Sequence, residues 1–193
     1  MKRFLIVLIA MACSLVMFSE QHMMFRTLSL DGNIKTAMKE VKKWGFMGMK
    51  IKNVAALVGS LDGEEVMITL MATPKTNTLF SVAVVYEGSD HWNELLAKYN
   101  TINTFITAKY GEPSETINYW EPPYSIDNNP IQAFKNDQAK YGALYITPEG
   151  KISVNIISAG GQMSTMVTYI DDKNAELFEQ EGGKDFDFLQ EEL

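Results

Sequence analysis

Apolar residues recur at steps of three and four between positions 89 and 111, which is the period of an amphipathic α-helix. The apolar positions are Trp92, Leu95, Leu96, Tyr99, Ile102, Phe105 and Ile106. Ser89 is placed to cap the first turn, and Gly111 followed by Pro113 ends the helix. We predict that this helix covers a sheet and that its aromatic residues, Trp92, Tyr99 and Phe105, are buried against the sheet of the first half of the chain, which precedes the helix.

Alternation of apolar and polar residues, which is the period of a strand, predicts a sheet on both sides of this helix. The expected strands are 23–30, 54–61, 64–73, 78–87, 115–121, 141–147, 151–158 and 162–170. Residues 78–87 are apolar on both faces, so we expect that strand at the centre of the sheet. Asp62-Gly63 is a strong hairpin turn between two of the strands.

Further helices are expected at 33–44, 127–138 and 171–180. The order of elements is therefore β-α-β-β-β-α in residues 23–111 and again in residues 114–181. We predict an α+β fold, an antiparallel sheet with helices packed on it, built as two tandem halves of one domain at residues 20–182. Residue identities do not repeat, so element order alone indicates the repeat. Acidic residues gather near the end, and 183–193 is expected to form a flexible tail.

The first 19 residues have the layout of a secretory signal peptide. Lys2 and Arg3 form a basic start, the uncharged run FLIVLIAMACSLVMF follows, and Ser19 offers a small residue for cleavage. This run is too short for a transmembrane helix, which needs about 20 residues. We expect an exported protein that begins near Glu20, in the periplasm or at the cell surface, with no transmembrane segment after cleavage. The single cysteine, Cys13, permits no internal disulfide and offers lipid attachment as an alternative.

The charge balance narrows the range of partners. Removal of residues 1–19 takes away two of the 17 basic residues and none of the 24 acidic ones, which leaves a net charge of −9. Nucleic acids and anionic membranes require a basic patch, so we expect neither as a partner. The first helix carries lysines outside its apolar face, at positions 35, 39, 42 and 43. Solvation is their expected role, and an anion site is the alternative.

Few side chains in the sequence suit catalysis. The chain has two histidines, His22 and His91, and it lacks the HExxH, Gly-x-Ser-x-Gly and Walker-type phosphate-loop motifs. We therefore predict no metal, no cofactor and no catalytic residue, and a non-enzymatic binding or protein-interaction domain. The alternative is a carboxylate-dependent hydrolase acting on glycans, because Asp and Glu are plentiful.

The segment that joins the two halves is rich in aromatic residues, and its two prolines stiffen it. Strand alternation puts Ile117 and Tyr119 on one face and Trp120 on the other. Exposed aromatic residues beside a carboxylate suit a contact with a protein or with a sugar ring. The predicted binding residues, for an unknown protein or carbohydrate partner, are Tyr119, Trp120, Glu121 and Tyr124. The alternative is a hydrophobic clasp between the halves.

Several stretches resemble a known group of proteins. These are LSLDGNIKTAMKEVKKWGF, the strand pair after it, PKTNTLFSVAVVY and the helix end KYGEP. They are similar to small exported proteins of unknown function from Bacteroides-type gut bacteria, and the resemblance covers most of residues 25–170. It implies an export context and no catalytic residues. The repeated element order is also similar to that of tandem-repeat β-lactamase-inhibitor-like proteins, which is a likeness of fold alone.

Overall fold

The structure, a computed structural model, describes residues 21–159 and 161–183. The predicted signal peptide at 1–19, with Cys13, lies outside the described residues. The same holds for the predicted acidic tail at 183–193, apart from Gly183.

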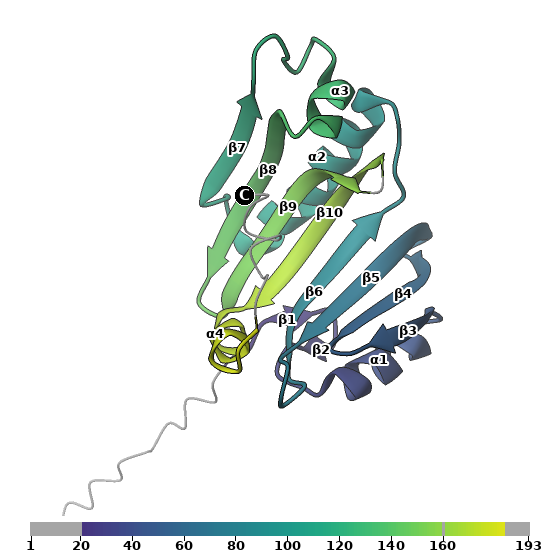
Figure 1. Cartoon of the computed structure of the whole chain (residues 1–193), viewed down its shortest axis with the longest axis vertical. Helices are drawn as coiled ribbons and strands as arrows, with labels where there is room; N and C mark the ends of the chain where they lie inside the picture. The colour runs from purple at the N-terminus through teal and green to yellow at the C-terminus, as the bar shows by residue number, and fades with distance from the viewer. Residues whose placement is uncertain (1–20, 160, 184–193) are drawn as a thin grey trace, which may run out of the picture.

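The fold is α+β, as predicted, and its main element is one antiparallel sheet of eight strands (Figure 1). Its order is β3-β4-β5-β6-β10-β9-β8-β7, so the two halves share a single sheet. The strands of the first half are β3 (Met47–Ile51), β4 (Val54–Leu61), β5 (Glu64–Ala72) and β6 (Leu79–Tyr86). Those of the second half are β7 (Glu115–Trp120), β8 (Ala139–Thr147), β9 (Gly150–Ala159) and β10 (Gln162–Asp171).

The last strand of each half meets the other at the centre of the sheet. β6 and β10 pair antiparallel, with Val84 opposite Val167 and Ala83 opposite Thr168. We call this pairing the seam. The central position of β6 confirms the prediction made from its two apolar faces, because both sides of a central strand are covered.

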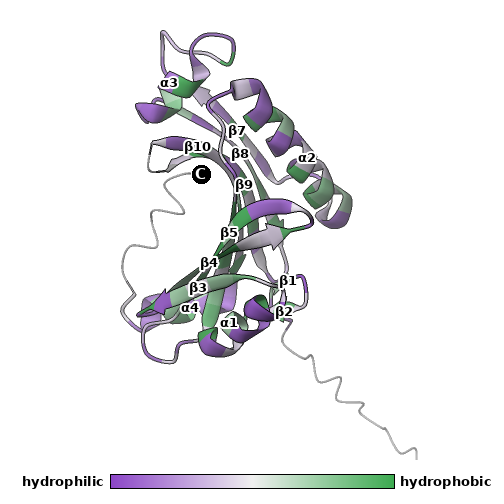
Figure 2. Cartoon of the chain, turned by 90° about the vertical axis from the view of Figure 1, so that its right-hand side faces the viewer, coloured by the Kyte–Doolittle hydropathy of each residue, from purple (hydrophilic) through white to green (hydrophobic). Residues whose placement is uncertain are grey.

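The two faces of the sheet are covered by different elements. The face that carries Val84 and Val167, called the core face here, is packed by α1 (Ile34–Lys43) against β4 and β5, and by α2 (Trp92–Tyr110) against β8, β9 and β10. Figure 2 shows the sheet nearly edge-on with α2 on one side. The short helix α3 (Pro130–Lys135) adds Phe134 to the same core.

The opposite face, called the α4 face here, is packed by α4 (Asp172–Gln180). Asp171 begins this helix, and its carboxylate accepts a hydrogen bond from the backbone N–H of Asn174 at 3.0 Å. Phe178 of α4 packs on Phe80 of β6, with 4.7 Å between the ring centroids. Beyond the helix, the Glu181 carboxylate accepts hydrogen bonds from the backbone N–H groups of the turn between β5 and β6. These contacts hold α4 against one end of the seam.

Three local predictions differ from the structure. The expected strand at 23–30 is a tight hairpin of β1 (Met24–Phe25) and β2 (Leu28–Ser29), because Arg26 takes a left-handed φ of 55° and reverses the chain. Strand β3 was not predicted. It lies at the edge of the sheet, and its apolar side chains are exposed. The helix expected at 127–138 shortens to α3, because Asn129 and Asp137 on either side of it are left-handed.

The long helix forms as predicted, but three details were wrong. It packs mainly on β8, β9 and β10 of the second half and not on the sheet of the first half, because the seam places the second-half strands beneath it. Its N-cap is His91 and not Ser89, whose hydroxyl instead accepts the His91 N–H at 2.9 Å. Phe105 was expected to be buried, yet 71% of it is exposed. Positions 95, 99, 102 and 106 form the buried stripe, and Phe105 lies about 100° around the helix from Ile106. Tyr99 is buried and Trp92 is half-buried.

None of the helices in the described part of the chain combines the length and apolar character needed to cross a bilayer.

Truncation of the buried stripe should destabilise the protein far more than truncation of the exposed phenylalanine. Ile102→Ala is expected to lower the free energy of unfolding by about 2–5 kcal/mol, because it leaves a cavity against the sheet. Phe105→Ala on the same helix should change it by no more than about 0.5 kcal/mol. Chemical denaturation measures both values, and equal losses would contradict this placement of α2.

The anchor of α4 should depend on pH. Burial acts to raise the pKa of Glu181, but hydrogen bonds from Thr76, Lys75 and Thr73 outweigh it and hold that pKa below the usual 4.5. A lowered folded-state pKa stabilises the protein above pH 4.5, and the contribution disappears as the pH falls through the folded-state value. Glu181→Gln should therefore destabilise the protein at neutral pH and make little difference in strong acid. A difference that persisted in acid would show that ionisation of Glu181 has no part in the anchor.

Candidate functional site

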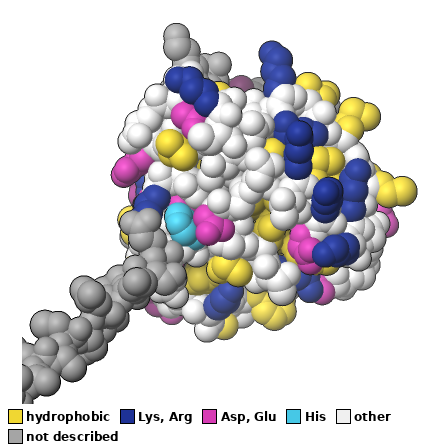
Figure 3. All heavy atoms as spheres, turned by 90° about the horizontal axis from the view of Figure 1, so that it is seen from below, with side chains coloured by type: hydrophobic (Ala, Val, Ile, Leu, Met, Phe, Trp, Pro, Cys, Tyr) yellow, Lys and Arg dark blue, Asp and Glu magenta, His cyan; other side chains and the backbone are white. Residues whose placement is uncertain are grey.

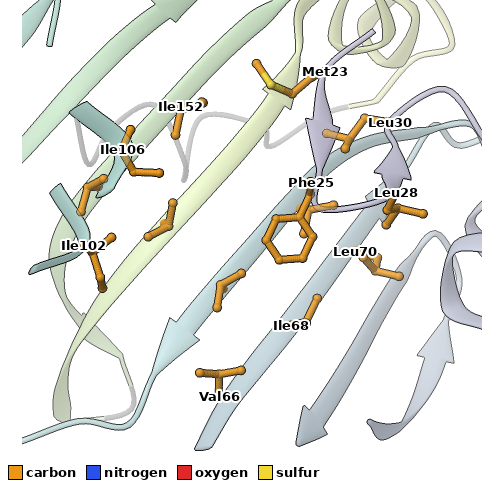
Figure 4. Close-up of a cluster of buried hydrophobic side chains, with 14 of the residues drawn as sticks. Met23, Phe25, Leu28, Leu30, Val66, Ile68, Leu70, Ile102, Ile106 and Ile152 are labelled. Carbon is orange, nitrogen blue, oxygen red and sulfur yellow. The ribbon is translucent and has the colours of Figure 1, made fainter. Parts of the chain in front are cut away.

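An apolar groove of about 270 Å³ lies on the core face above the seam. Its floor is Val84 and Val167, which lie opposite each other in the β6–β10 register. Ile102 and Ile106 of α2 form one wall, and Phe25 of the β1–β2 hairpin stands on the other side (Figure 4). The groove exists because α1 and the hairpin cover one half of the sheet and α2 covers the other. We call it the seam groove.

Two tyrosines extend the floor of the seam groove. Tyr86 and Tyr169 lie diagonally on either side of the valine pair, because the register sets Val82 opposite Tyr169. The Tyr169 ring packs on Phe25 at 5.2 Å between centroids. Burial raises the pKa of Tyr169, and neighbouring tyrosines add to the rise. Burial is also the main cause of the raised pKa of Tyr86. Both phenols therefore stay protonated at neutral pH and can donate a hydrogen bond.

The rim of the seam groove combines charge with an exposed aromatic ring. Arg26 and Asp62 form an ion pair, with 3.0 Å between Arg26 Nη1 and Asp62 Oδ2. Both residues come from tight turns in which the backbone is left-handed. Phe105 of α2 also lines the groove. The site is thus an apolar slot with aromatic sides, two phenol groups and a charged rim.

A second, polar cavity of about 580 Å³ lies where the N-terminal part of α2 passes the start of β5. It is lined by the carboxylates of Glu64, Glu65, Glu87 and Glu94. All four residues are exposed, Glu64 pairs with Lys98, and Glu94 accepts a hydrogen bond from the Ser89 hydroxyl at 2.6 Å. Among the described residues, no group of three or more His, Cys, Asp or Glu side chains is arranged to hold a metal ion.

His22 and Asp171 form the one close His–carboxylate pair in the described part of the chain, with 2.9 Å between Nδ1 and Oδ2. The same Asp171 oxygen accepts the Met23 backbone N–H at 2.9 Å, while the other oxygen caps α4. Asp171 is 1% exposed. An imidazole oriented by a carboxylate can accept a proton. Here the carboxylate also ties the start of the described chain to α4, which gives it a structural role.

The lysines of α1 lie on its outer face, as predicted, and they are all exposed: Lys35, Lys39, Lys42 and Lys43. Figure 3 shows basic side chains gathered on this side of the molecule. Lys43 pairs with Glu40 on the same helix at 2.7 Å. Nothing else in the described surroundings of these lysines marks an anion site.

The predicted binding residues Tyr119, Trp120, Glu121 and Tyr124 do not come together on one surface. Tyr119 lies on the α4 face of β7, is 51% exposed, and donates a hydrogen bond to Glu121 at 3.3 Å. Trp120 points to the core face, opposite Ala139. Tyr124 is half-buried and accepts a hydrogen bond from the Asn136 amide. The alternation of Tyr119 and Trp120 is as predicted, but it separates the aromatic residues instead of grouping them.

Trp120 belongs to an aromatic cluster that links α2 to the second half. Its ring packs edge-on against Trp92 at 5.5 Å and against Phe134 at 5.7 Å. Trp92 also packs on Tyr141 at 5.8 Å. A hydrophobic clasp between the halves requires Trp120 to pack on apolar residues of both, and its contacts with Trp92 and Phe134 are of this kind. The role of the four residues in binding stays a prediction.

The seam groove was not predicted from the sequence. Its residues come from the hairpin, the ends of β4 and β6, the middle of α2 and the end of β10. Tyr86 and Tyr169 could be assigned to one face of their strands by alternation, but their proximity depends on the β6–β10 pairing. The available signal is the position of Phe105, one step from the buried stripe, but the helical period alone includes Phe105 in the core.

Comparison with known proteins gave no match: no family model fits the chain, and no curated protein or solved structure is significantly similar to it. The resemblance to exported proteins of Bacteroides-type bacteria therefore stays a prediction.

The two neighbouring aromatic residues of β7 should behave differently on truncation. Trp120→Ala is expected to cost about 1–3 kcal/mol of stability, because two aromatic pairs are lost and each contributes about 0.5–1.5 kcal/mol. Tyr119→Ala removes an exposed ring and should cost no more than about 0.5 kcal/mol. Thermal or chemical denaturation of the two variants tests the cluster. A neutral Trp120→Ala variant would rule out the clasp.

Proposed function

We propose that this chain is a non-enzymatic binding domain that holds an apolar side chain of a protein partner in the seam groove. The predicted signal peptide would place this activity outside the cytoplasm. The observation that carries the proposal is the exposure of Phe105 beside an aromatic slot on an otherwise well-packed core face. A large exposed aromatic ring next to a concave apolar surface is typical of the centre of a protein interface.

The size and chemistry of the groove support a side chain as its occupant. Sites for drug-sized ligands usually have volumes of about 300–1,000 Å³, so a groove of about 270 Å³ suits a single aromatic or aliphatic side chain. The phenols of Tyr86 and Tyr169 can donate hydrogen bonds to carbonyl groups of the partner backbone. Arg26 and Asp62 at the rim offer charge contacts that set orientation more than affinity.

The alternative function, a carboxylate-dependent hydrolase, has less support. Such an enzyme needs two carboxyl groups at a defined separation across a cleft, one of them with a raised pKa. The acidic cavity near α2 supplies exposed glutamates, two of which are engaged by Lys98 and Ser89. The seam groove has one carboxylate at its rim, Asp62, and that carboxylate is paired with Arg26.

A random heptapeptide library displayed on phage and selected on the immobilised protein tests this proposal. Selected peptides should share an aromatic or large aliphatic residue, and they should compete with one another for one site. Phe105→Ala should weaken their binding by about 1–2 kcal/mol, roughly five- to thirtyfold, with little loss of stability.

Ile51→Ala is the matched control, because Ile51 is also a large apolar residue, 67% exposed, but lies on the edge strand β3. Its binding of the peptides should equal that of the unmodified protein. If Ile51→Ala weakened binding and Phe105→Ala did not, the edge of the sheet would be the docking surface and the seam groove would be excluded.

A further inference from the structure

The α4 face carries buried side-chain oxygen atoms that have no hydrogen-bond partner among the described residues. They are Ser81 Oγ of β6, Thr168 Oγ1 of β10 and Asn155 Oδ1 of β9. The pairing of β6 with β10 and of β10 with β9 places all three side chains on this face, on the central strands of the sheet. Buried polar groups in native proteins are nearly always paired, so each of these atoms indicates a missing partner.

The helix on this face covers one end of the central strands. α4 begins directly after the end of β10, and its Phe178 packs on Phe80 at the start of β6. Asn155 and Ile157 lie farther along β9, yet they are 2% and 7% exposed. On the outer strand β4, Val58 of the same face is 56% exposed. The part of this face that is shielded from solvent therefore lies over β6, β10 and β9 and extends beyond α4.

We propose that residues 184–193 dock on the α4 face of their own chain, running from the end of α4 along β10 and β9. This interaction is separate from the seam groove, which lies on the opposite face. The exit point of the chain and the length, alternation and charge of the segment each support this occupant.

The described chain ends on the α4 face itself. The Gly183 N–H donates to the Phe178 carbonyl at 2.9 Å. A Cβ atom at Gly183 would stand 2.4 Å from the Phe178 ring, so the backbone there lies directly on that ring. Because Phe178 packs on Phe80, the described chain ends at the apolar cluster of this face.

The following ten residues are long enough to reach the buried polar atoms. Ten extended residues span about 33 Å. The α4 face of β10 from Ile170 to Gln162 covers eight residue steps, about 26 Å at the rise of a strand. The segment can therefore run the full length of the seam.

The sequence of the segment, KDFDFLQEEL, fits the chemistry of the face. In an extended chain, Phe186 and Phe188 point to one side and Asp185 and Asp187 to the other. The two rings can pack on the apolar side chains around Met166, while backbone N–H and C=O groups of the segment pair with the buried polar atoms.

Charge complementarity points the same way. The segment carries four acidic residues and one lysine. Lys140 of β8 and Lys151 of β9 lie on the α4 face, and the Lys151 ammonium is 3.9 Å from Asp172. Of the acidic residues of this face, Glu65 lies on β5, on the other side of the seam, and Glu115 lies on the outermost strand β7. The two lysines thus give the β9–β8 side of the seam, along which the segment is proposed to run, the charge that favours an acidic segment.

A spin label tests the proposal in the full chain. With Cys13→Ser and Gln190→Cys, the chain has a single thiol, at which a nitroxide is attached. Amide NMR signals of Asn155, Met166 and Thr168 should lose most of their intensity relative to the reduced label. Signals of α1, on the other face of the sheet and away from the seam, should keep theirs. Unchanged signals for all three central residues would overturn the proposal.

Two matched variants and one mixture sharpen the result. Phe186→Ser with Phe188→Ser should restore the signals, whereas Asp185→Ser with Asp187→Ser, at the alternate positions, should leave them weakened. If the aspartate pair restored them as fully, the packing of the two rings would not be the anchor and the proposal would fail. A mixture of spin-labelled chain without ¹⁵N and ¹⁵N chain without label should show no loss; a loss there would assign the face to a second copy instead.

Discussion

The pairing of β6 with β10 is the constraint on which the rest of the structure depends. It joins four strands of one half to four of the other, so that a single sheet provides the floor for α1, α2 and α4. Both strands are buried on both faces and largely apolar, and such a strand is not suited to an edge exposed to water. Burial of the two faces therefore requires the halves to close on one another.

The position of the candidate site follows from this closure. The first half supplies both long helices of the core face, α1 over its own strands and α2 over those of the second half, and these covers meet over the seam without filling it, which leaves the groove between Phe25 and Ile102. On the other face a single helix covers one end of the seam, and the remaining centre is lined by Ser81, Asn155 and Thr168. One pairing thus creates an apolar slot on one side and, on the other, buried polar atoms set among apolar side chains.

Much of the fold could be predicted from local patterns, and the site could not. Alternation and turn residues such as Asp62-Gly63 give the strands and hairpins, because these signals depend on neighbouring residues alone. The fate of Phe105 could not be read in this way, since Phe105 and Ile106 are both apolar and a rotation of one position decides which is buried. Residues Tyr119 and Trp120 are adjacent in sequence, yet the sheet lies between their side chains. The seam groove could not be predicted for the opposite reason: Tyr86 and Tyr169 are distant in sequence but line the same groove.

The central place of the last strands also sets an order for folding during synthesis. β6 ends at Tyr86 and its partner begins at Gln162, so the ribosome must deliver the whole second half before the seam can close. Until then the hydrogen-bonding edge of an apolar strand stays open, which favours pairing with other chains. Contacts of such long sequence separation also make folding slow. The pairing of β6 with β10 gives the finished protein a continuous core. In the growing chain, however, it leaves one edge of β6 unpaired until the last strand has been made.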